Sequence, residues 1–383
     1  MALALRGGAT LVALWGQLGS LMDLVAGVAL AGIGTGLTVL VAREALEPRQ
    51  RELLRAALRV GLSVSLAAAI ALAAFAAFSP RAVALTGLSP AVLAFGAAAG
   101  CITVAPGLIN SFWQGLQRSG AMLGLAFGSA ALSLAAALLA PQRWILEALA
   151  GAQALPALLL AVVPGRAGEG EAEPEPAGRA ARHLLRFVPP SVAIGILSPA
   201  AMLGARSVVS GALSWHAAGE LQALWRVADW VGSVASGALA VYFLPRLGAA
   251  AGTPRFAGEL KRAARATILP SAAAFGVLLA LQRPIFALLY DASVRFDYGT
   301  VALFFSGSLA RIAAWVPLFA LYAARSTLAI TLGELLSLPL FAVLLAAFAP
   351  GLTLERAGAL WLASYLVYGA FNLWALRARF TAA

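Results

Sequence analysis

The chain has 383 residues, of which 62% are hydrophobic and 11% are charged, and its formal net charge is +11. Soluble domains carry roughly a quarter charged residues, so this composition excludes a soluble enzyme and indicates a membrane protein. The positive charge does not indicate nucleic-acid binding, because the arginines fall in short segments between apolar runs.

The apolar runs lack the alternating pattern of about ten residues that marks a membrane β-barrel, which leaves helices as the spanning element. A helix that crosses a bilayer needs about 20 apolar residues. Apolar runs bounded by Pro, Gly or Arg predict helices at residues 18–42, 53–79, 88–112, 120–140, 143–164, 184–211, 219–245, 264–289, 298–324, 326–349 and 357–377. We therefore predict an all-α, polytopic membrane protein with about eleven transmembrane helices.

One strongly polar segment interrupts this series, at residues 166–179, where Gly, Pro and Glu predominate. Such a composition does not pack and predicts a flexible linker. The sequence thus predicts an N-terminal bundle of five spans at 1–164, a cytoplasmic linker at 165–183 and a C-terminal bundle of six spans at 184–383. Two helical bundles around a central cavity are the plan of many transporters, which carry substrate between the halves.

Basic residues are concentrated in every second loop: Arg43, Arg49, Arg51, Arg55, Arg59, Arg118, Arg166, Arg179, Arg182, Arg186, Arg246, Arg255, Lys261, Arg262, Arg265, Arg325, Arg377 and Arg379. The positive-inside rule assigns these loops to the cytoplasm, which predicts a cytoplasmic C-terminus in a bacterial inner membrane and an N-terminus outside. Residues 1–17 do not read as a signal peptide. Either the start is read differently in the cell, or one amino-terminal helix is missing from this version of the chain.

The predicted helix at 219–245 carries a polar stripe, in which Gln222, Arg226, Asp229, Ser233 and Gly237 recur at three- and four-residue spacing. Charged side chains inside a span usually face a cavity, a partner or a transport path. The stripe predicts a water-filled groove. Alternatively, Arg226 and Asp229, three residues apart, pair with each other.

Two more arginines fall within or near the ends of predicted spans. Arg311 has no acidic neighbour at helical spacing, so we expect it to bind an anion or a carboxylate from another helix; alternatively it extends to the membrane interface. Arg206 lies near the end of the span at 184–211 and is expected to be an interfacial anchor or to lie at a cavity mouth. Both are candidate substrate-binding residues.

Other polar residues complete the candidate set. Asn110 and Gln114 form a milder stripe at the end of the span at 88–112, which helix-helix hydrogen bonding explains as readily as substrate binding. Asp23, Asp229 and Glu334 are the carboxylates within spans, so proton coupling would have to use some of them.

The sequence offers no basis for a cofactor or a catalytic centre. With one cysteine, Cys101, and two distant histidines, His183 and His216, we expect no disulfide and no metal site. The only lysine, Lys261, follows no glycine-rich loop, which excludes a Walker A phosphate site within this chain.

Three blocks of the sequence carry a resemblance to a known family. The segment Gly34-Thr-Gly-Leu-Thr-Val-Leu-Val-Ala-Arg43 looks like the early helix of Wzx-type flippases of lipid-linked oligosaccharides, and residues 110–118 resemble a characteristic loop of that family. The most specific match is Ala218-Gly-Glu-Leu-Gln-Ala-Leu-Trp-Arg-Val-Ala-Asp229 with its continuation to Leu247, which is similar to a helix of the enterobacterial common antigen branch. Ser308 stands where related proteins tend to be acidic, so a coupling role at that position does not transfer.

The resemblance implies a twelve-helix member of the multidrug and oligosaccharidyl-lipid flippase superfamily, here without its first helix. It implies that the chain is a transporter that moves an undecaprenyl-diphosphate-linked oligosaccharide (O-antigen or common-antigen unit) for cell-envelope polysaccharide biosynthesis. Membrane lipids, and polysaccharide polymerase machinery, would be its partners. Arg226, Arg311 and Arg206 suit a diphosphate. The alternatives are a cation-coupled multidrug exporter of the same fold and a membrane scaffold without transport activity.

Overall fold

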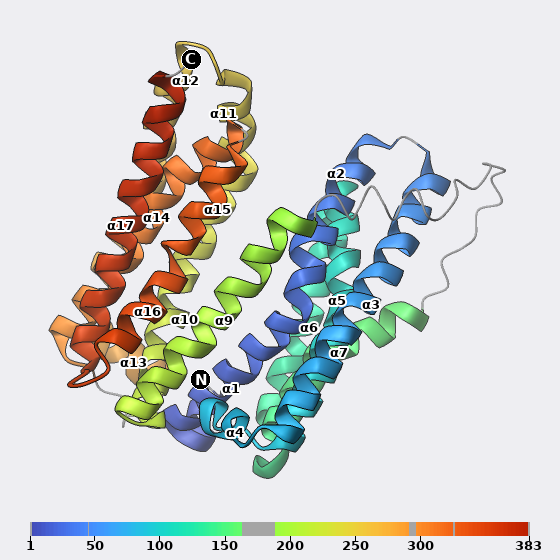
Figure 1. Ribbon diagram of the computed structural model, residues 1–383, viewed down its shortest axis with the longest axis vertical. Coiled ribbons are helices and arrows are strands. Elements are labelled where there is room, and N and C mark those ends of the chain that lie inside the picture. Colours follow the sequence, from blue (N-terminus) through green and yellow to red (C-terminus); the bar gives the residue numbers. More distant parts are fainter. Residues whose placement is uncertain (1, 45, 163–187, 291–295, 325, 382–383) are drawn as a thin grey trace. The chain divides into compact units, whose positions relative to one another are not determined.

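The structure is a computed structural model that describes residues 2–44, 46–162, 188–290, 296–324 and 326–381 (Figure 1). Every regular element in these ranges is helical. The predicted all-α class is therefore confirmed, while the predicted linker at 165–183 lies outside the described residues. Among the described residues, nine helices are long and apolar enough to cross a membrane.

The chain forms two compact units. The N-terminal unit contains Leu14–Leu203, and the C-terminal unit combines Leu3–Ala13 with Gly204–Ala383. Both boundaries fall inside helices, α1 (Ala2–Val28) and α9 (Val188–Ala212), so each of these helices contributes to both units.

The remaining helices of the N-terminal unit are a π-helical turn (Ala29–Gly34), α2 (Thr35–Arg43), α3 (Glu47–Phe78), α4 (Pro80–Thr86), α5 (Pro90–Gly115), α6 (Ser119–Leu139) and α7 (Ile145–Val162). Small residues let these helices approach closely. A Cβ added at Gly115 of α5 would lie 2.9 Å from the Thr38 carbonyl oxygen of α2. At the same crossing, the Thr38 hydroxyl donates to the Ser111 carbonyl at 2.9 Å.

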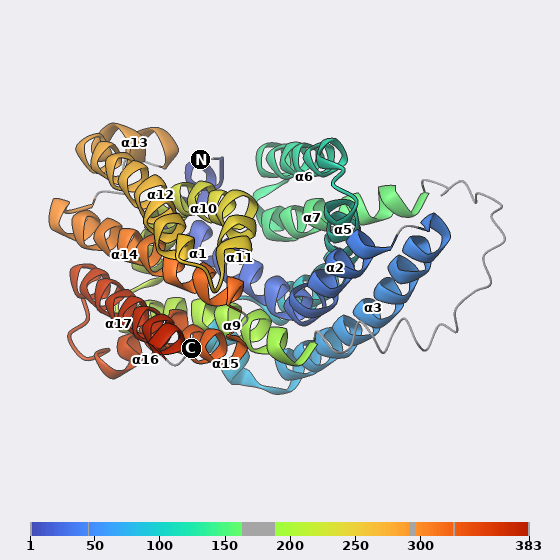
Figure 2. The same cartoon turned by 90° about the horizontal axis from the view of Figure 1, so that it is seen from above.

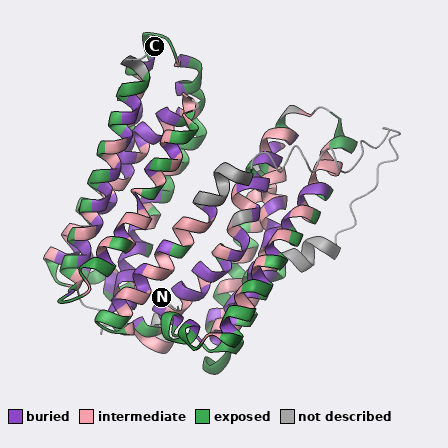
Figure 3. Cartoon of the chain, viewed as in Figure 1, coloured by how far each residue is buried: buried purple, intermediate pink, exposed green. Residues whose placement is uncertain are grey.

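The C-terminal unit contains α10 (Trp215–Ala238), a second π-helical turn (Leu239–Phe243), α11 (Leu244–Ala250), α12 (Arg255–Ala280), α13 (Gln282–Leu289), α14 (Tyr298–Ala323), α15 (Thr327–Leu335), α16 (Leu338–Ala347) and α17 (Leu354–Thr381). In this unit α14 packs along α17 and also contacts α10 and α12 (Figure 2). Gly307 permits the α14–α17 contact, because a Cβ there would lie 2.9 Å from the Leu362 nitrogen. Buried residues line the inward faces of these helices (Figure 3).

Three predicted spans differ from the observed helices. The predicted helix at 18–42 begins earlier, at Ala2, with a kink at Gly7–Gly8, where Gly8 has a φ of 61° that favours glycine. The predicted helix at 264–289 covers two helices, since α12 ends at Ala280 and α13 follows it. Helix α12 also starts earlier than predicted, at Arg255, because its first turns are basic and hydropathy does not detect them.

The predicted helix at 326–349 is also divided, since the chain leaves the helix at Leu336–Ser337 between α15 and α16. Pro339 lies in the first turn of α16, where it lacks a backbone N–H that a continuous helix would need. The predicted spans at 143–164 and 184–211 overlap α7 and α9, which run up to undescribed residues.

Gly219 of α10 provides a test of close packing in the C-terminal unit. A Cβ at Gly219 would collide with the Ala9 carbonyl of α1, and both residues are buried. We expect Gly219→Ala to lower the free energy of unfolding by about 1–3 kcal/mol, because backbone must move to admit the methyl group. Thermal unfolding of the purified protein in detergent measures this loss of stability. Gly237→Ala on the same helix, where nothing lies within 4 Å, is the matched control and is expected to unfold like the parent.

Candidate functional site

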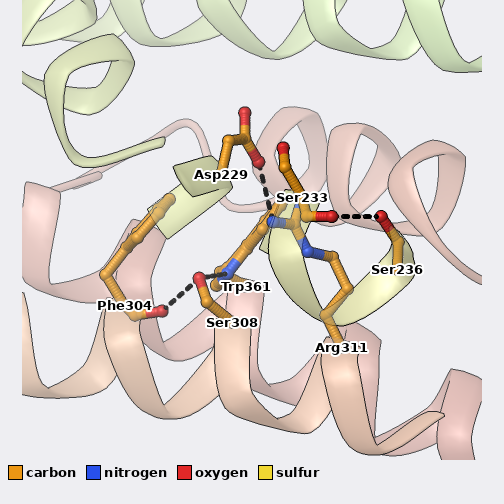
Figure 4. Close-up of polar contacts among 7 residues, drawn as sticks. All are labelled: Asp229, Ser233, Ser236, Phe304, Ser308, Arg311 and Trp361. Atoms are coloured by element: carbon orange, nitrogen blue, oxygen red, sulfur yellow. Dashed lines mark hydrogen bonds and ion pairs between the residues drawn. The ribbon is translucent and has the colours of Figure 1, made fainter. Parts of the chain in front are cut away.

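An ion pair between α14 and α10 is the centre of the candidate site (Figure 4). The Arg311 Nη2 atom donates to Asp229 Oδ1 at 2.7 Å. The Arg311 side chain is 11% exposed and the Asp229 side chain 43% exposed, so the protein largely encloses the arginine and only partly covers the carboxylate. The expectation that Arg311 takes a carboxylate from another helix is confirmed, and the alternative pairing of Arg226 with Asp229 is wrong.

Three aromatic rings surround the Arg311 guanidinium. Its Cζ atom lies 5.2 Å from the centroid of Trp315, 5.5 Å from that of Trp361 and 6.0 Å from that of Tyr365. Ring faces attract a cation at such distances by about 0.5–2 kcal/mol each. These three residues, which we call the aromatic cage, contact the guanidinium in addition to Asp229.

Trp361 is itself fixed by a buried network. Its indole Nε1 donates to the Ser308 hydroxyl at 3.1 Å, and that hydroxyl donates to the Phe304 carbonyl at 2.9 Å (Figure 4). The rings of Phe304 and Trp361 stack with centroids 5.1 Å apart, and Phe341 meets Trp361 edge-on at 5.0 Å. Ser308 therefore positions the aromatic cage, which is a structural role that a hydroxyl can fulfil without charge.

Arg206 and Gln222 lie deeper than the sequence suggested. Arg206 is 1% exposed, its Nη1 donates to Gln222 Oε1 at 2.7 Å, and its Cζ lies 6.0 Å from the Trp225 ring. The prediction of an interfacial anchor or a cavity mouth is wrong, because Gln222 of the next helix supplies a buried acceptor. In this conformation both side chains are buried.

The exposed part of the polar stripe on α10 consists of Arg226, Ser233 and Gly237. Arg226 interacts electrostatically with Tyr290, which follows α13. Burial raises the pKa of Tyr290 to about 12, and the positive charge of Arg226 partly offsets this increase. Arg226 thus presents an accessible positive charge one turn of helix away from Asp229.

Glu334 belongs to a separate polar cluster at the break between α15 and α16. The Tyr368 hydroxyl donates to its Oε1 at 2.9 Å, and the Ser337 hydroxyl contacts its Oε2 at 3.4 Å and donates to its backbone carbonyl at 2.7 Å. Tyr368 and Tyr365, with ring centroids 6.0 Å apart, connect this cluster to the aromatic cage.

The remaining candidates lie in the N-terminal unit. Asp23 is an exposed residue of α1, Asn110 is a half-buried residue of α5, and Gln114 is exposed near the end of α5. Within the described ranges no group of three or more His, Cys, Asp or Glu side chains could hold a metal ion.

The sequence did not lead us to predict the aromatic cage. One face of α17 carries polar and aromatic side chains at spacings of four, three and four residues: Trp361, Tyr365, Tyr368 and Asn372. The first two of these belong to the cage. This regular aromatic and polar stripe was the available signal. In a helix of transmembrane length such residues are equally typical of interfacial positions, so their spacing alone did not distinguish a site.

Comparison with solved structures shows that the chain has a known fold. The chain resembles the inward-facing conformation of a multidrug resistance MATE family transporter of the MOP superfamily, with a TM-score of 0.76 and 13% identity over 99% of this chain and 92% of the other. The outward-facing conformation of such a transporter gives a TM-score of 0.62 and 16% identity over 98% and 89%.

A third similar structure is a MOP superfamily transporter from Pyrococcus furiosus, described as having a binding pocket of reverse polarity that suggests a different function; it gives a TM-score of 0.64 and 13% identity over 99% and 90%. No family model matches the sequence, and no curated protein does. The chain is thus a multi-pass membrane protein with the fold of MATE family transporters of the MOP superfamily.

Proposed function

We propose that this transporter is a flippase that moves an undecaprenyl-diphosphate-linked oligosaccharide across the bacterial inner membrane for cell-envelope polysaccharide biosynthesis. The observation that carries the proposal is Arg311, a guanidinium held by aromatic rings inside a transmembrane unit. Buried positive charge is costly in a membrane and usually serves transport. Arginine binds phosphate oxygens through several donors, which suits a diphosphate.

The balance of charge around the site supports an anionic headgroup. Arg311 is offset by Asp229, whereas Arg226 adds an exposed positive charge on the same helix as Asp229. A cationic drug would be repelled by this excess, while a diphosphate would be attracted. The polyprenyl tail can remain in lipid while only the headgroup enters the protein.

The proposal extends to place and partners. The basic loops indicate a cytoplasmic C-terminus in the inner membrane. Substrate would be taken from the cytoplasmic leaflet, where the sugar is assembled on its lipid, and delivered to polysaccharide polymerase machinery on the far side. The resemblance to the Wzx-type family supports this direction.

The second candidate function is a cation-coupled multidrug exporter. The Glu334 cluster favours it, because a carboxylate beside tyrosine rings suits an organic cation or a coupling ion, and multidrug transporters share the fold. In that case expression in a drug-sensitive host would raise resistance to cationic drugs, and Glu334→Gln would remove the resistance.

Gene deletion in the native organism tests the flippase proposal. We expect undecaprenyl-diphosphate-linked oligosaccharide to accumulate in the cytoplasmic leaflet, where a membrane-impermeant sugar-oxidising reagent added to spheroplasts does not reach it. Complementation by the parent should restore surface polysaccharide. A deletion strain with normal precursor levels and normal surface polysaccharide would refute the proposed substrate.

A further inference from the structure

The hydrogen bond between Arg311 and Asp229 is monodentate, although a guanidinium can bind an anion through two nitrogen atoms at once. The Nε–H and the Nη2–H of a guanidinium point in the same direction, and together they match two oxygens of a carboxylate or phosphate. Asp229 accepts from Nη2 alone, and Arg311 Nε is a buried donor without an acceptor among the described residues. A buried donor without a partner costs about 1–3 kcal/mol, so the site favours any anion that fills both positions.

Contacts other than the bond to Asp229 also enclose the Arg311 guanidinium. The aromatic cage surrounds the guanidinium from α14 and α17, and Gly232 of α10 leaves room for it: a Cβ at Gly232 would lie 3.1 Å from Arg311 Nη2. These contacts would remain if Asp229 moved away, and they would keep the guanidinium near its present position with its donor edge free.

Asp229 is suited to withdraw. The Asp229 side chain is 43% exposed and the Arg311 side chain 11% exposed, so the protein encloses the carboxylate less than the guanidinium. If the pair separates, the enclosed guanidinium is left without an anion inside the protein, which is costly. The enclosed arginine therefore needs an anion beside it, and another anion could take the place of Asp229.

We infer that Asp229 occupies the place of a substrate phosphate oxygen on Arg311, and that it competes with the diphosphate of the substrate for this guanidinium. The inference rests on the proposed function and adds a regulatory residue to it. In the empty transporter Asp229 neutralises the buried charge, which excludes weak anions. A diphosphate displaces Asp229 because it fills both Nε and Nη2 and carries more negative charge.

Binding of inorganic pyrophosphate, and of undecaprenyl diphosphate without sugar, to the full chain in detergent tests the inference. Calorimetry gives the Kd, and fluorescence of the tryptophans near Arg311 reports on the site. We expect Asp229→Asn, and Asp229→Ser as a second variant, to bind pyrophosphate about tenfold more tightly, because the internal competitor is gone. Glu355→Gln, which removes an exposed carboxylate of the same unit, is the matched control and should leave the Kd unchanged.

A purely structural ion pair predicts that the Asp229 variants bind pyrophosphate no more tightly than the parent. If Asp229→Asn and Asp229→Ser elute and melt like the parent but bind pyrophosphate no more tightly, the inference is overturned while the proposed function stands. If the parent and all variants bind neither pyrophosphate nor undecaprenyl diphosphate, the proposed function fails together with the inference.

Discussion

Replacing Arg311 with Ala is expected to reduce translocation of the lipid-linked substrate by about 100-fold or more. Hydrogen bonds to a charged group contribute about 1.5–3 kcal/mol each, and the guanidinium supplies two of them to the diphosphate. Arg311→Lys keeps the charge but removes the planar pair of donors, so we expect it to recover only a small part of the rate. The measurement is the movement of undecaprenyl-diphosphate-linked oligosaccharide across reconstituted proteoliposomes.

The same substitution also removes the ion pair with Asp229 and the contacts with the aromatic cage, so we expect it to lower the free energy of unfolding as well, and transport is therefore compared at equal amounts of folded protein. Arg265→Ala, which removes an exposed cation of α12 outside the candidate site, is the matched control and should transport like the parent. Translocation by Arg311→Ala at the parental rate would show that the guanidinium does not bind the substrate.

Replacing Trp361 with Ala is expected to be the most destabilising single change at the candidate site. Trp361 is 1% exposed and contacts the rings of Phe304, Phe341, Trp225 and Tyr365. Truncation of a buried Trp to Ala costs about 3–5 kcal/mol, from lost contacts and from the cavity that remains. Thermal or denaturant unfolding of the purified protein in detergent measures this loss.

Trp374→Ala on the same helix is the matched control, since Trp374 is 64% exposed, and its melting temperature should stay near that of the parent. Trp361→Phe should give an intermediate loss, because it keeps a ring but leaves the Ser308 hydroxyl without its indole donor. Equal stability of Trp361→Ala and Trp374→Ala would contradict the view that the network around Trp361 forms the core of this unit.

The sequence was sufficient to predict the helical class, because apolar runs of about 20 residues have few other structures available to them. It was less informative on boundaries. Hydropathy does not detect the basic first turns of α12, because they precede the apolar run. Hydropathy also does not detect the break at Leu336–Ser337, because the residues on both sides of it are apolar.

The candidate residues were predicted better than their partners. Arg311 and Asp229 were identified as charged residues inside spans, but 82 positions separate them, and helical spacing carries no information about a contact between distant helices. The burial of Arg206 was missed for a similar reason, because its acceptor Gln222 belongs to the next helix. A single intramembrane charge predicts that a partner exists without identifying it.

The most direct test of the central claim, that the C-terminal unit carries an anion site for a lipid diphosphate, is a transport assay with two substrates. Proteoliposomes that contain the purified chain would be supplied with undecaprenyl-diphosphate-linked oligosaccharide and, separately, with a cationic drug. The account predicts that the lipid-linked sugar crosses, that Arg311→Ala stops it, and that the drug is not moved. Transport of the drug together with no movement of the lipid-linked sugar would contradict it.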